Sequence, residues 1–268
     1  MTRRSAAAVW LPVGLLLAAC APHRLELPTG AGEPFPEYAQ ALQGATADCR
    51  GVRTFSAELS IAGRAGHEKL RGRVAAGLAE PARARLEGIA PFGPPAFILV
   101  ADGSSATLFL PRDNRVLAAA SPAVILDALV GLDLGAADLR AILAGCVATD
   151  LQPASGRSYA GGWGRIELTG GGTVFVQRDG RKPWRVRAGL RPPLRIEYER
   201  APGATTLEAV RLSTIGEVGS GTDLRIGLSQ VETNVTLALA VFSIKIPPDA
   251  VPLTLAELRQ AGPVGPRK

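Results

Sequence analysis

Cysteines and histidines are the side chains with the widest scope for chemistry in this 268-residue sequence, which has three of the former and two of the latter. His23 and His67 do not form a pair with metal-ligand spacing. No Gly-x-Ser-x-Gly elbow accompanies the serines, and the glycine-rich segment GGWGRIELTGGG lacks the strand-to-helix context of a phosphate-binding loop. We therefore expect no metal, no cofactor and no enzyme. The rival class, a hydrolase, would need an acid, a base and a nucleophile clustered by the fold.

Cys20 is expected to carry lipid. Residues 1–19 combine Arg3 and Arg4 with an apolar run too short to span a bilayer, which is typical of an export signal. The run ends in Leu-Ala-Ala-Cys, which resembles a bacterial lipobox, and Ala21 rather than Asp follows the cysteine. We predict an acylated Cys20 anchored in the outer membrane and facing the periplasm; the alternative is an ordinary cleaved signal with a chance cysteine.

Cys49 and Cys146 remain as an even pair in an oxidising compartment. A disulfide is the predicted state, and two buried free thiols are the alternative.

The charge balance is mildly basic. The formal net charge is +6, and removal of the signal would lower it by two. The basic side chains, such as Arg73, Arg85, Arg187 and Arg195, are spread along alternating segments without clustered aromatics. We expect a solvated sheet face and no nucleic-acid partner.

The chain divides into four parts. Residues 1–19 are the predicted signal, and residues 20–35, rich in proline and glycine, form a predicted tether. Residues 36–260 form one domain, and residues 261–268 a predicted disordered tail. The domain is expected to open with a short helix from Pro36, and Thr254 to Glu257 has the spacing of a capping box for a last helix.

Alternating apolar residues predict two antiparallel meanders, over residues 52–117 and from about 159 to 247, the latter ending in NVTLALAVFSIKI. Between them, Ser121-Pro122 begins one apolar helix and Gly145 ends another. About eleven strands with a helical insertion predict a mainly β single domain whose helices lie on the concave face of the sheet. The interior could be a filled core or a ligand cavity.

The turn Ala90-Pro-Phe-Gly-Pro-Pro95 places Phe92 where polar residues usually stand. Two interpretations remain open: the ring contacts something outside the domain, or it folds back onto the sheet as core.

The blocks RLEGIAPFGPPAFILVADGSSATLFLP and SPAVILDALVGLDLGAADLRAILAG, in this order after a lipobox, resemble the LolB family of outer-membrane receptors for lipoproteins. The resemblance covers roughly residues 50 to 250. It implies the LolA/LolB lipoprotein-localisation fold, an unclosed antiparallel β-barrel whose helices lid an apolar cavity for acyl chains. It also implies that Phe92, with Pro91 and Gly93, takes the place of the exposed leucine that contacts the membrane in that family.

The resemblance further implies a non-catalytic, chaperone-like acceptor that receives client lipoproteins from a LolA-type periplasmic carrier and delivers them to the outer membrane. We expect a monomer. The strand and helix periods predict the cavity lining: Phe55, Leu59, Ile61, Val74, Leu78, Leu126, Leu129, Leu139 and Ile142. The alternative is a scaffold lipoprotein that has a filled core and holds a protein partner at an exposed sheet edge.

Overall fold

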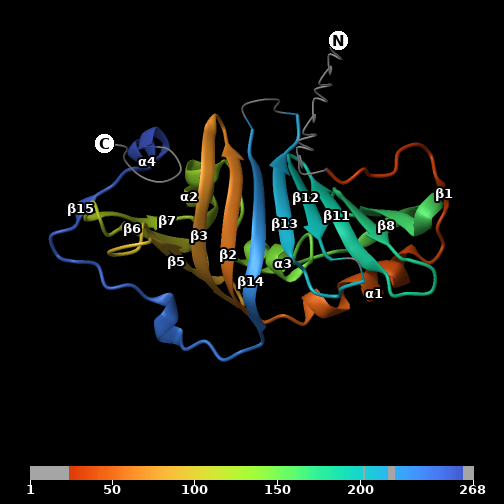
Figure 1. Cartoon of the computed structure of the whole chain (residues 1–268), viewed down its shortest axis with the longest axis horizontal. Coiled ribbons are helices and arrows are strands. Elements are labelled where there is room, and N and C mark those ends of the chain that lie inside the picture. The colour runs from red at the N-terminus through yellow and green to blue at the C-terminus, as the bar shows by residue number, and fades with distance from the viewer. Residues whose placement is uncertain (1–23, 202, 217–220, 262–268) are drawn as a thin grey trace, which may run out of the picture.

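A computed structural model describes residues 24–201, 203–216 and 221–261, and its strands form one open sheet (Figure 1). The predicted signal and Cys20 lie outside the described residues, as does the predicted tail except for its first residue, Ala261, which ends a helix. The strands are β1 (Glu33–Pro34), β2 (Thr54–Ala65), β3 (Glu68–Ala79), β4 (Arg83–Ile89), β5 (Ile98–Asp102), β6 (Ser105–Leu110), β7 (Arg115–Ala120), β8 (Pro153–Tyr159), β9 (Trp163–Leu168), β10 (Thr173–Gln177), β11 (Arg185–Arg191), β12 (Leu194–Glu199), β13 (Ala209–Thr214), β14 (Asp223–Thr233) and β15 (Val251–Pro252). The helices are α1 (Tyr38–Arg50), α2 (Pro122–Val130), α3 (Ala136–Ala144) and α4 (Leu255–Ala261), with short 3₁₀ turns η1 (Ala160–Gly162) and η2 (Leu239–Phe242).

Two meanders build the sheet. One runs from β2 to β7 and the other from β8 to β14, and the long strands β14 and β2 pair side by side to join them. All pairs in the described residues are antiparallel except β7 with β15. The two edge strands, β1 and β15, are two residues long each. The mainly β, unclosed fold predicted from the sequence is confirmed, with more strands than the eleven expected.

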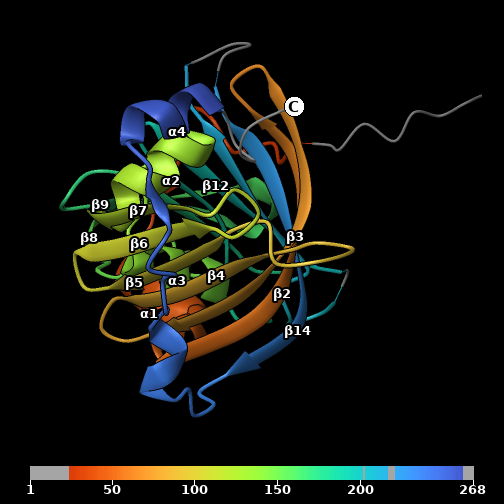
Figure 2. The ribbon, with the colours of Figure 1, turned by 90° about the vertical axis from the view of Figure 1, so that its left-hand side faces the viewer.

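Helices α1, α2 and α3 lie on the concave side of the sheet. Figure 2 shows β2, β3 and β14 curving around them. The strand alternation explains this arrangement: Phe55, Ala57 and Leu59 are buried on the concave face, while Ser56 and Glu58 between them are partly exposed. The apolar faces of the helices complete one continuous core.

Local signals fix where the helices begin and end. Ser121 precedes α2 in extended conformation with Pro122 at the first helical position, and Gly145 ends α3 with a φ of 105°. The capping box of α4 forms, because the Glu257 carboxylate accepts hydrogen bonds from both the backbone N–H and the hydroxyl of Thr254. These three predictions are confirmed. The predicted start of the first helix at Pro36 is wrong, because α1 begins at Tyr38 after Glu37.

The predicted strand over residues 234–246 is also wrong. β14 ends at Thr233, and the chain then continues without a strand through η2. Its apolar residues Leu237, Val241 and Phe242 pack outside the main core, against Ala79 and Val100. The alternation of apolar residues in this segment therefore reflects a small satellite cluster rather than a place in the sheet.

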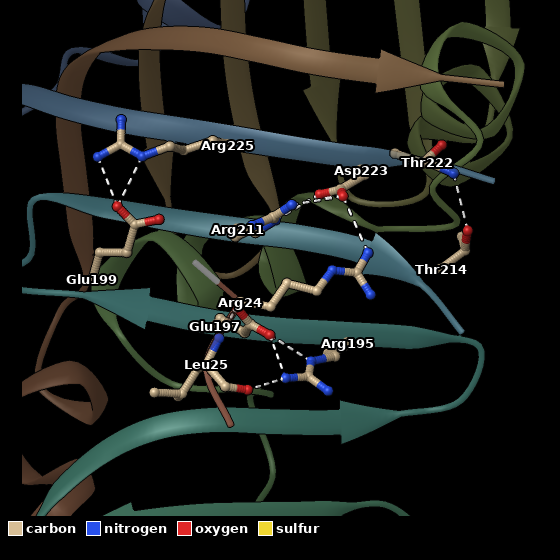
Figure 3. A network of polar contacts seen from close by, with 10 residues as sticks. All are labelled: Arg24, Leu25, Arg195, Glu197, Glu199, Arg211, Thr214, Thr222, Asp223 and Arg225. Carbon is tan, nitrogen blue, oxygen red and sulfur yellow. Dashed lines mark hydrogen bonds and ion pairs between the residues drawn. The ribbon is translucent and has the colours of Figure 1, made fainter. Parts of the chain in front are cut away.

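The N-terminal strap, residues 24–35, corrects the prediction of a free tether. Arg24 contacts Asp223 at 3.1 Å, and Arg195 donates a hydrogen bond to the Leu25 carbonyl at 2.6 Å (Figure 3). Farther along, Tyr159 donates to the Gly30 carbonyl, β1 pairs with β8, and Phe35 is buried. The strap is therefore held on the sheet mainly by backbone hydrogen bonds and by side chains at its two ends. Its proline-rich composition does not prevent these contacts.

Candidate functional site

An apolar cavity of about 230 Å³ lies between the concave face of the sheet and the helices α2 and α3. Its walls come from both meanders and from the segment that joins the two helices. Its lining side chains are almost all aliphatic or aromatic, which suits hydrocarbon rather than a polar ligand. They include Leu59, Ile61, Leu70, Val74, Leu86, Phe97, Leu99, Leu126, Leu129, Val130, Leu132, Leu134, Leu139, Leu212, Leu224 and Ile226.

The structure brings six of the nine predicted lining residues to this cavity: Leu59, Ile61, Val74, Leu126, Leu129 and Leu139. The other three lie elsewhere in the core, with Phe55 1% exposed and both Leu78 and Ile142 fully buried. They occupy the predicted inward faces, but Phe55 and Leu78 pair with each other near the other end of β2 and β3, where α3 fills the space. The spacing of apolar residues predicts which face of a strand or helix points inward, but not which part of that face borders the cavity.

The contribution of the second meander to the cavity was not predicted from the sequence. Leu212 of β13 and Leu224 and Ile226 of β14 line the cavity because β14 pairs directly with β2. Their alternation was visible in the sequence. The pairing of the two meanders, which brings them beside Ile61, was not.

An exposed segment of β3 borders the cavity. Arg71 and Arg73 flank Gly72 on β3, and all three residues line the cavity. Arg73 lies 3.5 Å from Glu58, and its side chain is largely exposed. Gly72 faces open space, since a Cβ atom added there would meet no heavy atom within 4 Å. The missing side chain keeps this border open.

The loop between β4 and β5 starts and ends at the rim of the cavity. Gly88 and Phe97 line the cavity and join the base of the loop, because the Gly88 N–H donates to the Phe97 carbonyl at 3.0 Å. The Phe97 ring lies so close to Gly88 that an added Cβ would come within 2.7 Å of it. The glycine is therefore required for this close packing.

Phe92 stands at the tip of this loop with 88% of its surface exposed. Arg112 supports the tip from the neighbouring hairpin by donating to the Phe92 carbonyl at 3.0 Å, and Gly93 supplies a φ of 74°. The alternative in which Phe92 folds back as core is wrong. An exposed aromatic ring on a supported turn is suited to contact an apolar surface outside the domain.

Cys49 and Cys146 form a disulfide, with their Cα atoms 5.6 Å apart. The bond joins the last turn of α1 to the second residue after α3. Tyr198 donates a hydrogen bond to the Cys146 carbonyl at 2.8 Å, and burial raises the pKa of this phenol well above its usual range. The buried Arg140 of α3 donates to the Val52 carbonyl. α3 is thus held to the sheet and to α1 at several points.

The two histidines do not contribute to a metal site in the described residues. His67 lies in the turn between β2 and β3, and His23 lies outside the described residues. In the ranges given above, no three His, Cys, Asp or Glu side chains gather in a way that could hold a metal ion. None of the helices in the described part of the chain has both the length and the apolar composition that crossing a bilayer requires.

Comparison with known proteins identifies the fold but no family. No protein-family model and no curated protein matches the sequence. A LolA superfamily protein from Nitrosomonas europaea is similar in structure, with a TM-score of 0.53 and 10% identity over 77% of this chain and 97% of that one. A DUF1329 family protein from Desulfovibrio piger gives a TM-score of 0.51 and 12% identity over 79% and 98%. The chain therefore has a LolA-like fold.

Proposed function

We propose that this protein is a lipid-anchored acceptor of acylated lipoproteins, which holds their acyl chains in the cavity and delivers them to the outer membrane. The observation that carries the proposal is the apolar cavity with the exposed Phe92 loop at its rim. A cavity of this lining provides a site for hydrocarbon, and the loop provides a contact with the bilayer that would receive it.

The size of the cavity indicates which element must move. Pockets for drug-sized ligands usually measure about 300–1,000 Å³, so 230 Å³ has room for only part of a multiply acylated client. Of the two helices that line the cavity, α2 is held less firmly, since it has two buried residues, Pro122 and Ile125, whereas α3 has six. Outward displacement of α2 would enlarge the cavity, whereas α3 is fixed by the disulfide.

The strap supports a defined orientation at the membrane. Cys20 precedes Arg24 by four residues, so an acyl anchor on Cys20 would lie within roughly 14 Å of Arg24 at full extension. Arg24 contacts Asp223, and the next residue, Leu224, lines the cavity. The predicted anchor and the cavity therefore belong to the same end of the sheet, which favours a mouth held close to the bilayer.

The similarity to a LolA superfamily protein is consistent with this proposal at the level of the fold. The alternative, a scaffold that binds a partner through a sheet edge, has less support. Both edges in the described residues are strands of two residues, too short to offer a long row of free backbone groups.

The test is transfer of a radiolabelled lipoprotein from a loaded LolA-type carrier to outer-membrane vesicles. It uses the chain from residue 21 onward, which contains every described element. Phe92→Glu is the informative variant. Leu239→Glu is the matched control, because Leu239 is also an exposed apolar residue, 70% exposed on η2.

The wild-type and Leu239→Glu proteins are expected to strip the client from the carrier and release it to vesicles. Phe92→Glu should take the client and retain it, because a carboxylate at the tip opposes insertion into the apolar region of the bilayer. A wild-type protein that takes no client from the carrier would refute the proposal. Equal transfer by both variants would refute the role given to Phe92.

A further inference from the structure

A second concave site lies at the opposite end of β12 from the strap. Arg195, near the start of β12, contacts the strap, whereas Arg200 follows the last residue of the strand. A groove of about 850 Å³ opens beside Arg200, between the ends of β10 and β11 and the loop that joins them. Five basic side chains line it: Arg178, Lys182, Arg185, Arg187 and Arg200.

The groove contains far more positive than negative charge. The one carboxylate among the lining residues, that of Asp179, forms an ion pair with Lys182 at 2.7 Å. The four arginines make no ion pair with any carboxylate of the described residues, although most other arginines on this sheet do. The Nε of Arg200 is buried and has no hydrogen-bond partner in the described part of the chain. Another nitrogen of the same guanidinium, Nη1, donates to the Val186 carbonyl at 2.9 Å, which holds the group at the groove.

The arginines are crowded as well as unpaired. Burial, together with the nearby positive charges of Arg185 and Arg187, lowers the pKa of Arg200 to about 10. Burial also lowers the pKa of Arg187. Burying these positive charges close together therefore reduces the stability of the fold. An anion bound in the groove would offset part of this loss.

Aromatic and amide groups hold two of the guanidinium groups in place. Arg178 lies over the Trp184 ring at 4.5 Å, and Arg187 lies 5.8 Å from the centre of the Trp163 ring. Arg187 also donates to the Gln177 side-chain oxygen at 2.7 Å. Stacked guanidinium groups lose little further freedom when they bind, and their planar donor arrays match the oxygens of a phosphate group.

We infer that this groove is a binding site for a phosphate-bearing anion, recognised by Arg178, Arg185, Arg187 and Arg200. The excess of unpaired cations favours a group with more than one negative charge, and the concave shape favours a small molecule or a lipid headgroup over a flat macromolecular surface. The inference does not depend on the proposed function, because the groove and the apolar cavity share no lining residue.

The test uses tryptophan fluorescence, because two of the three tryptophans of the chain lie against groove arginines. The full chain is held in phosphatidylcholine nanodiscs and titrated with inorganic phosphate, with sodium chloride at equal ionic strength as the blank. A second arm uses soluble short-chain phosphatidylglycerol, with short-chain phosphatidylcholine as its blank. A saturable change in either arm is expected.

Arg185→Gln is the main variant, since this side chain has no hydrogen bond that folding requires in the described residues. It should weaken binding roughly tenfold or more, the usual effect of losing a charge-assisted hydrogen bond. Arg200→Gln should do the same. Arg83→Gln removes the same charge from β4, where Arg83 pairs with Asp102, and should leave binding unchanged.

The two arms identify the source of the phosphate. Saturation by inorganic phosphate at a lower concentration than by phosphatidylglycerol indicates a soluble ligand, and the reverse order indicates a lipid headgroup; both support the site. The absence of a saturable change in both arms would overturn the inference. Equal weakening by Arg83→Gln would also overturn it, because binding would then reflect net charge alone.

Discussion

Removing the disulfide should cost stability without removing the site. The change is the double substitution Cys49→Ala and Cys146→Ala, which avoids reductant. The bond closes a loop with a sequence separation of 97 residues. In the chain-entropy model a loop of this length constrains the unfolded chain by about 4.7 kcal/mol, so the free energy of unfolding should fall by roughly 3–5 kcal/mol.

The assay is urea denaturation followed by the fluorescence of Trp163 and Trp184, which lie outside the closed loop. The midpoint should fall sharply and the slope should rise somewhat, since the unfolded chain without the cross-link is less compact and exposes more surface. The folded variant should still bind a fatty acid, because both cysteines lie outside the cavity lining and Arg140 and Tyr198 still fix the end of α3. A loss below about 1 kcal/mol would refute the entropic reasoning. Loss of fatty-acid binding would refute the separation of stability from function.

Three other perturbations follow from individual contacts. Gly189→Ala places a methyl group 2.3 Å from the buried Val147 and should cost about 1–3 kcal/mol in thermal denaturation, less when combined with Val147→Ala. Hydrogen bonds from Arg211 and Arg24 lower the pKa of Asp223, and Asp223→Asn removes this negative charge. Trypsin should then cleave after Arg24 faster than in the wild type. An unchanged cleavage rate would argue against a docked strap. Hydrogen bonds from the Thr254 backbone, from Arg115 and from the Thr254 hydroxyl lower the Glu257 pKa to about 2, so the stabilisation that they give α4 is complete above the usual value of 4.5 and is lost as the pH falls toward 2. Hydrogen exchange should show that Glu257→Gln weakens the protection of α4 at pH 7 and matters little at pH 2.

The sequence predicts the faces of most strands because a half-buried sheet imposes a period of two on apolar residues. The prediction is wrong for segments in which apolar residues do not alternate between the core and the solvent. β8 was not predicted, since Gly156 on this strand leaves room for the Tyr38 ring of α1 instead of supplying an apolar side chain. Residues 234–246 alternate like a strand but serve a cluster outside the main core.

The two candidate sites differ in how far the sequence could predict them. Six of the nine predicted residues line the cavity, because face and period suffice for elements that all turn toward one interior. The cationic groove could not be predicted from the sequence, because its arginines come from different strands and loops. Arg187 was expected on a solvated face, and only the fold brings it near Arg200, which follows the next strand.

In the proposed function, an acyl chain enters the cavity beside Gly72. The most direct measurement is binding of a fluorescent fatty acid to the wild type, to Gly72→Trp and to Gly44→Trp. Neither glycine has a heavy atom within 4 Å of an added Cβ, but Gly72 lines the cavity and Gly44 lies on the exposed side of α1. Saturable binding is expected for the wild type and for Gly44→Trp, and a loss of affinity of at least tenfold for Gly72→Trp at unchanged stability. Equal binding by all three proteins would contradict it.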